Sequence, residues 1–362
     1  MKDNKKYTSL YNEHINLDAK MVDFAGFVMP VNYKKGIQYE YNAVRTQVGI
    51  FDVSHMGEIF VSGEEAASYL QYMTINDIGK LKLGDAQYNV ICNSNGGIKD
   101  DIIIYCTKNG YILIVNASNC EKIFNWLSLN NKFNCIVEDN SEKYSLIAVQ
   151  GPKSRKLISE IFNTSIDLSF YKHTSLKYNS KNILLSRTGY TGELGYEILG
   201  DHNSIVKLWK ALIQNNAIPC GLAVRDILRL EMKYCLYGND INEETSPIES
   251  NLDWVVNFNS DFLGSKSLLD QKKNGVKRKL VAFKMKDKCV PRKGYDIFYE
   301  NEKIGVVTSG TFSLSLKVGI GMGYIQSAYS KINSLINLKV RGKDNIGVVV
   351  KPPFIKEFSL HD

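Results

Sequence analysis

The sequence has no apolar run that approaches the length of a bilayer-spanning helix. Its longest apolar runs, such as residues 102–105 and 111–115, have four and five residues, whereas a spanning helix needs about 20. The first six residues are polar and lead into Tyr7 and Thr8 without the apolar core of a secretory signal. We therefore expect a cytoplasmic protein that does not use a membrane.

Paired cysteines and paired histidines are also missing. The seven cysteines are an odd number scattered along the chain, and no two of them form a C-x-x-C motif. The five histidines include no H-x-x-x-H pair or other metal-ligand spacing. These absences predict reduced, mostly buried thiols and no metal site.

A strong excess of charge is absent along most of the chain. The net charge is +7, but lysines and acidic residues are interspersed, which does not indicate a nucleic-acid partner. The one dense group, here named the basic cluster, consists of Lys272, Lys273, Lys277, Arg278 and Lys279. This group is typical of a solvated linker, and the alternative is a docking surface that steers an acidic partner.

The pattern of apolar residues predicts an α+β body followed by an all-β part. A chain of 362 residues exceeds what one core usually organises, which favours two or three domains. Helical periodicity predicts helices at residues 36–47, 64–73, 118–127, 153–162, 204–213, 222–232 and 265–273. Branched and aromatic runs predict strands at 58–61, 88–92, 102–106, 111–115, 145–149, 182–186, 280–285, 295–299, 304–308, 335–340 and 346–350.

Two consecutive acids, Asp100 and Asp101, stand where a glycine-containing turn leads into a strongly apolar strand. Strand alternation places them on opposite faces, so at least one carboxylate is expected near a pocket. An enclosed carboxylate needs partners and can act as a general base. The alternative, favoured for an anonymous pair, is that both acids finish the turn and stay hydrated.

Three further segments carry polar residues that the pattern alone leaves undecided. Asn116 ends a strand before a helix, so capping is its favoured role and a pocket contact the weaker alternative. Residues 187–197 contain three glycines without G-x-G-x-x-G spacing, which favours a hairpin over a nucleotide loop. On an apolar helix, Asp226 can pair with Arg229, and Arg225 is then left to solvent or to a buried anion or carbonyl.

Taken together, these segments resemble the glycine cleavage T-protein family of aminomethyltransferases. The resemblance rests on the order and spacing, along almost the whole chain, of residues 24–33, 49–57, 96–101, 187–197, 221–231, 236–241, 245–249, 308–310 and 351–354. It implies a three-domain cloverleaf around a central folate channel, with a C-terminal β-barrel or jelly-roll-like domain. The expected domains are residues 1–50 with 140–262, residues 51–139, and residues 263–362.

The resemblance also implies the site and its chemistry. Asp101 matches the catalytic aspartate of the family, whereas Asp100 looks structural. The positions expected to hold tetrahydrofolate are Glu197, Arg225, Tyr88, Asn116, Tyr171 and Tyr190. The implied partner is a lipoylated H protein, whose aminomethyl group supplies the carbon that tetrahydrofolate receives as ammonia is released.

Two other functions remain as alternatives at this point. The same fold serves folate-dependent demethylases of small sulfur or nitrogen compounds. A non-catalytic, folate-binding relative assists iron-sulfur cluster assembly, but its Lys-Gly-Cys-aromatic-x-Gly-Gln-Glu segment is absent from this sequence. The presence of Asp101 favours an enzyme over that scaffold.

Overall fold

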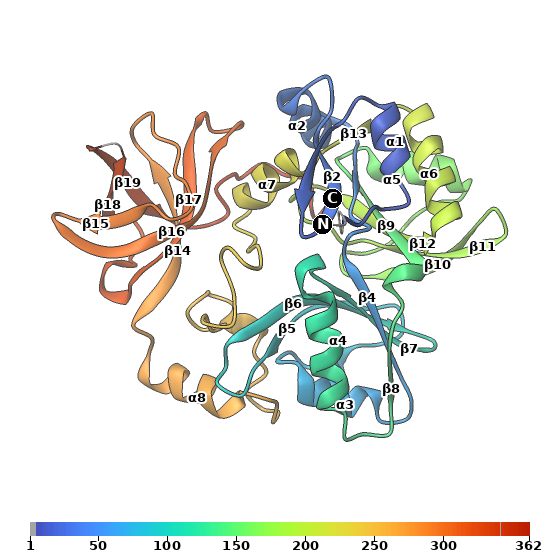
Figure 1. Cartoon of the computed structure of the whole chain (residues 1–362), viewed down its shortest axis with the longest axis horizontal. Coiled ribbons are helices and arrows are strands. Elements are labelled where there is room, and N and C mark those ends of the chain that lie inside the picture. Colours follow the sequence, from blue (N-terminus) through green and yellow to red (C-terminus); the bar gives the residue numbers. More distant parts are fainter. Residues whose placement is uncertain (1–4, 341) are drawn as a thin grey trace.

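The computed structural model describes residues 5–340 and 342–362, and these residues form three bodies built around separate sheets (Figure 1). The first sheet has the order β10-β11-β12-β9-β3-β13, and only the β13–β3 pair is parallel. Its strands are β3 (Gly49–Asp52), β9 (Tyr144–Gln150), β10 (His173–Tyr178), β11 (Lys181–Ser186), β12 (Gly195–Asp201) and β13 (Ile218–Pro219).

Helices cover the first sheet because each buries one apolar stripe against it. In α6 (His202–Gln214) the buried residues Ile205, Leu208, Trp209 and Leu212 recur at helical spacing. The Asp201 carboxylate accepts a hydrogen bond from the backbone N–H of Ser204 and so caps that helix. The other helices of this body are α1 (Tyr11–Asn16), α2 (Ile37–Thr46), α5 (Ser154–Phe162) and α7 (Leu222–Glu231), and a hairpin of β1 (Lys20–Phe24) and β2 (Phe27–Asn32) lies beside them.

The second body is a fully antiparallel sheet of order β5-β6-β7-β4-β8, with two helices. Its elements are β4 (Gly57–Ser62), α3 (Ala66–Met73), β5 (Ala86–Cys92), β6 (Ile98–Thr107), β7 (Gly110–Val115), α4 (Cys120–Leu129) and β8 (Ile136–Asp139). Short 3-10 turns occur along the whole described chain and are not confined to this body. They are η1 (Ile78–Lys80), η2 (Ala117–Asn119), η3 (Ser141–Lys143), η4 (Asp253–Val255) and η5 (Ser327–Tyr329).

The third body, orange to red in Figure 1, is a closed antiparallel barrel of order β14-β17-β16-β15-β18-β19. The helix α8 (Ser265–Asn274) precedes β14 (Arg278–Met285), β15 (Asp296–Tyr299), β16 (Glu302–Ser313), β17 (Val318–Gln326), β18 (Leu335–Val340) and β19 (Lys343–Val350). The pairing of β14 with both β17 and β19 closes the sheet. Closure leaves no free sheet edge.

The α+β prediction with a C-terminal barrel is confirmed, and all seven predicted helices lie within two residues of the observed ends. The strand prediction omitted β17, whose glycines weaken a strand signal. Gly321 is required there, since a Cβ at this position would come within 2.5 Å of the Phe283 ring. The predictions also omitted α1, β1, β2, β3, β8, β10, β12 and β13. The predicted domain boundaries remain a prediction.

Shared apolar cores join the three bodies. One core combines Val90 of β5, Leu230 of α7 and Met322 of β17, so that each body contributes to it. In the basic cluster, Lys272 and Lys273 lie in the last turn of α8, and Arg278 begins β14. In the described ranges no helix is both long and apolar enough to cross a membrane. The seven cysteines are all free thiols, as predicted.

Candidate functional site

A cavity of about 1000 Å³ lies where the three bodies meet. Its walls come from β5 and β6 of the second body, from α7 and β12 of the first, and from β14 and β19 of the barrel. The seven residues predicted from the sequence all line this one cavity: Tyr88, Asp101, Asn116, Tyr171, Tyr190, Glu197 and Arg225. The fold therefore brings together residues that are up to 137 positions apart in the chain.

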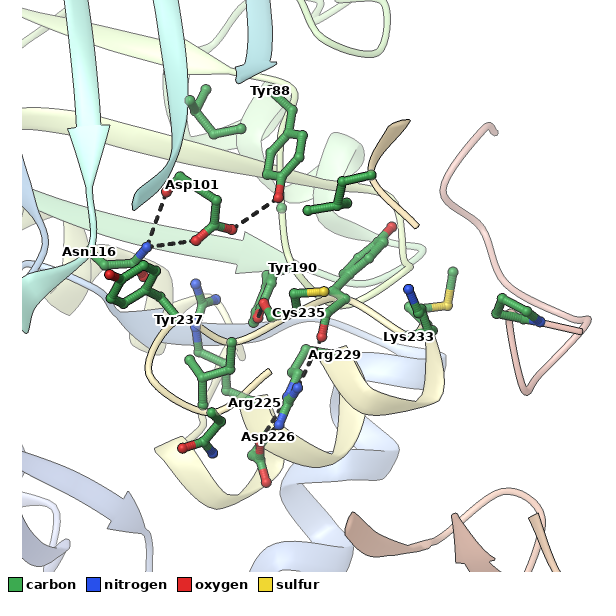
Figure 2. Close-up of a pocket in the computed structure, with 18 of the residues that line it drawn as sticks. Tyr88, Asp101, Asn116, Tyr190, Arg225, Asp226, Arg229, Lys233, Cys235 and Tyr237 are labelled. Atoms are coloured by element: carbon green, nitrogen blue, oxygen red, sulfur yellow. Dashed lines mark hydrogen bonds and ion pairs between the residues drawn. The ribbon is translucent and has the colours of Figure 1, made fainter. Parts of the chain in front are cut away.

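Asp101 is held between two donors at the start of β6 (Figure 2). The hydroxyl of Tyr88 donates to Asp101 Oδ2 at 3.1 Å, and the Asn116 amide donates to Oδ1 at 2.9 Å. The same amide also donates to the Asp101 backbone oxygen at 3.1 Å. Each carboxylate oxygen thus has one fixed partner, which orients the group that faces the cavity.

Asp100 has a different environment, although it is the adjacent residue. Its side chain is completely buried, and it accepts hydrogen bonds from the Asn116 backbone N–H at 3.0 Å, from the Asn116 amide at 2.8 Å and from the Asn119 amide at 2.5 Å. Asp100 is not among the cavity-lining residues. The hydrated alternative for the two acids is therefore wrong for Asp100, because its carboxylate has protein donors in place of water.

The capping role favoured for Asn116 is also wrong. Asn116 does precede the 3-10 turn η2, but its side chain makes no capping hydrogen bond there. Its amide instead reaches both carboxylates across the end of β7. The two carboxylates are strong acceptors that bind the Asn116 NH₂ group and so fix the orientation of its side chain.

The electrostatics of the two acids follow from their burial. Burial raises the pKa of Asp100, and the negative charge of Asp101 raises it further, against the donors from Asn116 and Asn119. Burial also raises the pKa of Asp101, while the hydrogen bonds from Asn116 and Tyr88 oppose the increase. A raised pKa brings this carboxyl group closer to the range in which it can exchange a proton at neutral pH.

Aromatic side chains form flat walls of the cavity. Tyr88 stacks on Trp254, with ring centroids 6.0 Å apart and an interplanar angle of 19°. Tyr190 stacks on Tyr234 at 5.6 Å and donates its hydroxyl hydrogen to the backbone oxygen of Cys235. Such walls suit a planar ring system that carries polar groups at its edge.

Tyr171 reaches the cavity through an unusual backbone conformation. Its φ of 58° lies in the left-handed region, which is uncommon for a residue with a bulky side chain. Its backbone N–H donates to the Arg187 oxygen at 3.1 Å, and its backbone oxygen accepts from Ala86 at 2.8 Å. These two hydrogen bonds hold the loop before β10 of the first sheet against β5 of the second sheet.

Glu197 and Arg225 line the cavity from two different elements of the first body. Glu197, on β12, is 9% exposed and accepts a hydrogen bond from the Thr188 hydroxyl at 2.5 Å. Arg225, on α7, has its guanidinium 4.9 Å from the Tyr190 ring centroid, and its Nη1 is buried without a hydrogen-bond partner among the described residues. Burial lowers the pKa of Arg225, and Glu197 and Tyr190 oppose that decrease.

The neighbouring Arg229, unlike Arg225, has ion-pair and hydrogen-bond partners for its guanidinium. It pairs with Asp226 at 2.7 Å, as the sequence predicted, and also with Asp240 at 2.7 Å. Its Nη2 donates to the Ser309 hydroxyl at 2.9 Å. Arg225, in contrast, keeps an unused donor inside the cavity, which points to a ligand acceptor.

Sequence reasoning missed several lining residues. Trp254 and Ile332 line the cavity although they are 70% and 53% exposed, and Lys233, Lys351 and the buried His55 also line it. His55 and Lys351 had a signal, since they stand in family-like segments, residues 49–57 and 351–354. Within the ranges 5–340 and 342–362, no group of three His, Cys, Asp or Glu side chains could hold a metal ion.

Comparisons with known proteins agree with this architecture. The family profile described as the GCVT N-terminal domain matches residues 10–260, and that of the glycine cleavage T-protein C-terminal barrel domain matches residues 278–356. The chain belongs to the glycine cleavage T-protein family. It is 46% identical to an aminomethyltransferase of Flavobacterium psychrophilum, over 97% of this chain and the whole relative. It is 44% identical to an aminomethyltransferase of Halothermothrix orenii over the same shares.

A solved structure of the T-protein family supports the same conclusion. The glycine cleavage system aminomethyltransferase T from Bartonella henselae is 32% identical and superposes with a TM-score of 0.93, covering 98% of this chain and 99% of that chain. The membership in the T-protein family therefore extends to the three-body arrangement that creates the cavity. An aminomethyltransferase is consistent with a cavity that exposes a positioned carboxylate.

Proposed function

We propose that this chain transfers the methylene carbon of an aminomethyl group, carried on the dihydrolipoyl arm of an H protein, to tetrahydrofolate. The products are methylene-tetrahydrofolate, ammonia and the reduced lipoyl thiol. The observation that carries the proposal is the placement of Asp101, fixed by Tyr88 and Asn116, in a cavity shared by three bodies of a T-protein fold.

The lining residues fit a reduced folate. A pterin edge offers adjacent N–H donors that a single carboxylate such as Glu197 accepts in bidentate fashion. The unused Nη1 donor of Arg225 requires an acceptor, which the polar atoms of folate supply. Tyr88, Tyr171 and Tyr190 provide aromatic walls for the ring system.

The reaction breaks the carbon–sulfur and carbon–nitrogen bonds of the aminomethyl group and forms two carbon–nitrogen bonds to folate amines. Two protons leave those amines, and they are taken up by the thiol and by ammonia. Asp101, with its raised pKa, orients a reacting amine and accepts a proton from it. The remaining acceleration comes from holding both reactants in one enclosed cavity.

The H protein is expected to present its arm through transient docking, and the basic cluster is the candidate surface. Lys273, Lys277 and Lys279 are exposed, and they have no ion pair among the described residues. Arg278 is partly structural, because it pairs with Glu249 at 3.0 Å. Clustered positive charge raises the encounter rate with an acidic partner without requiring tight binding.

The proposal is tested by incubating the protein with aminomethyl-loaded H protein and tetrahydrofolate. Ammonia and methylene-tetrahydrofolate are expected to form together, in equal amounts, and only when both reactants are present. Ammonia release that does not depend on folate would contradict the proposal. Methyl transfer from a small methylated compound in place of the H protein would instead support a demethylase.

A further inference from the structure

His55 is a second buried polar side chain of the cavity, and its ring nitrogens form no hydrogen bond with any described residue. It lies in the turn between β3 and β4, is 5% exposed and lines the cavity. The turn is firmly held, because the backbone N–H of Val53 donates to Leu146 at 3.0 Å and that of Met56 donates to Val53 at 3.1 Å. The imidazole therefore has a fixed position at the cavity wall.

The surroundings of the His55 ring are apolar on the protein side. The Phe24 ring meets it edge-on, with centroids 5.4 Å apart and an interplanar angle of 90°, and the Phe27 ring lies 6.4 Å away. Nδ1 is buried without a partner, and neither ring nitrogen forms a hydrogen bond with any described residue. A buried polar group that lacks a partner destabilises the folded protein.

Two other histidines of this chain, buried His14 and half-buried His173, have hydrogen-bond partners. His14 forms hydrogen bonds with Asp52 at 2.9 Å and with Tyr33 at 2.8 Å. His173 forms a hydrogen bond with the Cys106 backbone oxygen at 2.9 Å. His55 thus differs from both in forming no hydrogen bond with any described residue, and it is the one of the three that lines the cavity.

Burial keeps the His55 imidazole neutral. Burial lowers its pKa to about 4; Asp52 opposes this decrease and the positive charge of Arg225 adds to it. A neutral imidazole donates with one nitrogen and accepts with the other. His55 and the unsatisfied Nη1 of Arg225 therefore offer two kinds of hydrogen-bonding group on the same cavity.

We propose that His55 is a substrate-binding residue, whose imidazole forms a hydrogen bond with a polar atom of the folate that Arg225 also contacts. The inference rests on the proposed function for the identity of the ligand. The ligand-free protein is less stable because this nitrogen lacks a hydrogen-bond partner, and the bound ligand supplies that partner. Removing the nitrogens should therefore weaken binding without weakening the fold.

The test compares His55→Phe with His173→Phe, which makes the same chemical change at a satisfied histidine outside the cavity. Titration calorimetry with tetrahydrofolate and thermal unfolding of the ligand-free protein are measured for both. His55→Phe is expected to raise the Kd about tenfold, equivalent to about 1.4 kcal/mol, while the Tm stays the same or rises. His173→Phe is expected to lower the Tm and leave the Kd unchanged.

Two amide variants complete the design. The side-chain nitrogen of His55→Asn reaches the place of Nδ1 and that of His55→Gln the place of Nε2, so the nitrogen that contacts the ligand is identified by the variant that restores binding. A Kd for His55→Phe within twofold of wild type, or a loss of Tm without loss of affinity, would overturn the inference. Absence of tetrahydrofolate binding by the wild-type protein would instead refute the proposed function.

Discussion

Replacing Asp101 by Asn removes the proposed proton acceptor while nearly preserving its shape. In the wild-type protein Oδ2 accepts from Tyr88 and Oδ1 accepts from Asn116. An asparagine has one carbonyl oxygen, so it satisfies one of these donors and turns its NH₂ group toward the other. The structural cost is one hydrogen bond, about 1 kcal/mol.

A second effect of the Asp101→Asn change opposes this cost. The pKa of Asp101 is raised in the folded protein, so the folded state binds its proton more tightly than the unfolded state does. The stability from this group is complete below the unfolded pKa and is lost as the pH rises through the folded pKa. At neutral pH the neutral amide avoids that loss, so the net change in stability should be small.

The effect on turnover should be much larger. General acid–base catalysis contributes about 10²–10⁴-fold, which corresponds to about 2.7–5.4 kcal/mol of activation free energy. We therefore expect Asp101→Asn to lose at least 100-fold in kcat, with tetrahydrofolate affinity within a few-fold of wild type. The assay follows ammonia and methylene-tetrahydrofolate with saturating aminomethyl-loaded H protein.

Asp100→Asn is the matched control, because it makes the same change at the adjacent residue outside the cavity. Asp100 accepts three hydrogen bonds from Asn116 and Asn119, so its replacement should lower the Tm more than Asp101→Asn does. If Asp101→Asn keeps more than a tenth of wild-type turnover, the assignment of Asp101 as proton acceptor is refuted. Equal losses of turnover in both variants would point to a structural effect.

The remaining predictions concern pH, folate binding and docking. Because the pKa of Asp101 is raised, kcat should fall as the pH drops through a midpoint above that of an ordinary aspartate, and this limb should disappear in Asp101→Asn. Glu197→Gln should raise the Kd for tetrahydrofolate about tenfold with little change in Tm; an unchanged Kd would count against the pterin contact. Replacing Lys273, Lys277 and Lys279 by Gln should raise the KM for H protein several-fold and flatten its salt dependence, with folate affinity unchanged. Wild-type salt dependence in that variant would show that the basic cluster does not steer docking.

The local elements that the sequence determined are those with a strong periodic signal. The seven predicted helices, α2 to α8, match because their apolar residues recur at helical spacing and their ends carry ordinary boundary residues. The hairpin at residues 187–197 is confirmed as the connection between the paired strands β11 and β12. Through its resemblance to a family, the sequence also predicted seven residues that line one cavity.

Only the tertiary structure decided what each of those side chains does. No local pattern distinguishes Asp100 from Asp101, because their difference depends on Asn116, which follows β7, and on Asn119 in the turn η2. The role of Asn116 was misjudged for the same reason. Burial and charge at a cavity between three bodies depend on segments that are distant in the sequence. For this reason, only the folded structure shows that Nδ1 of His55 and Nη1 of Arg225 have no hydrogen-bond partner among the described residues.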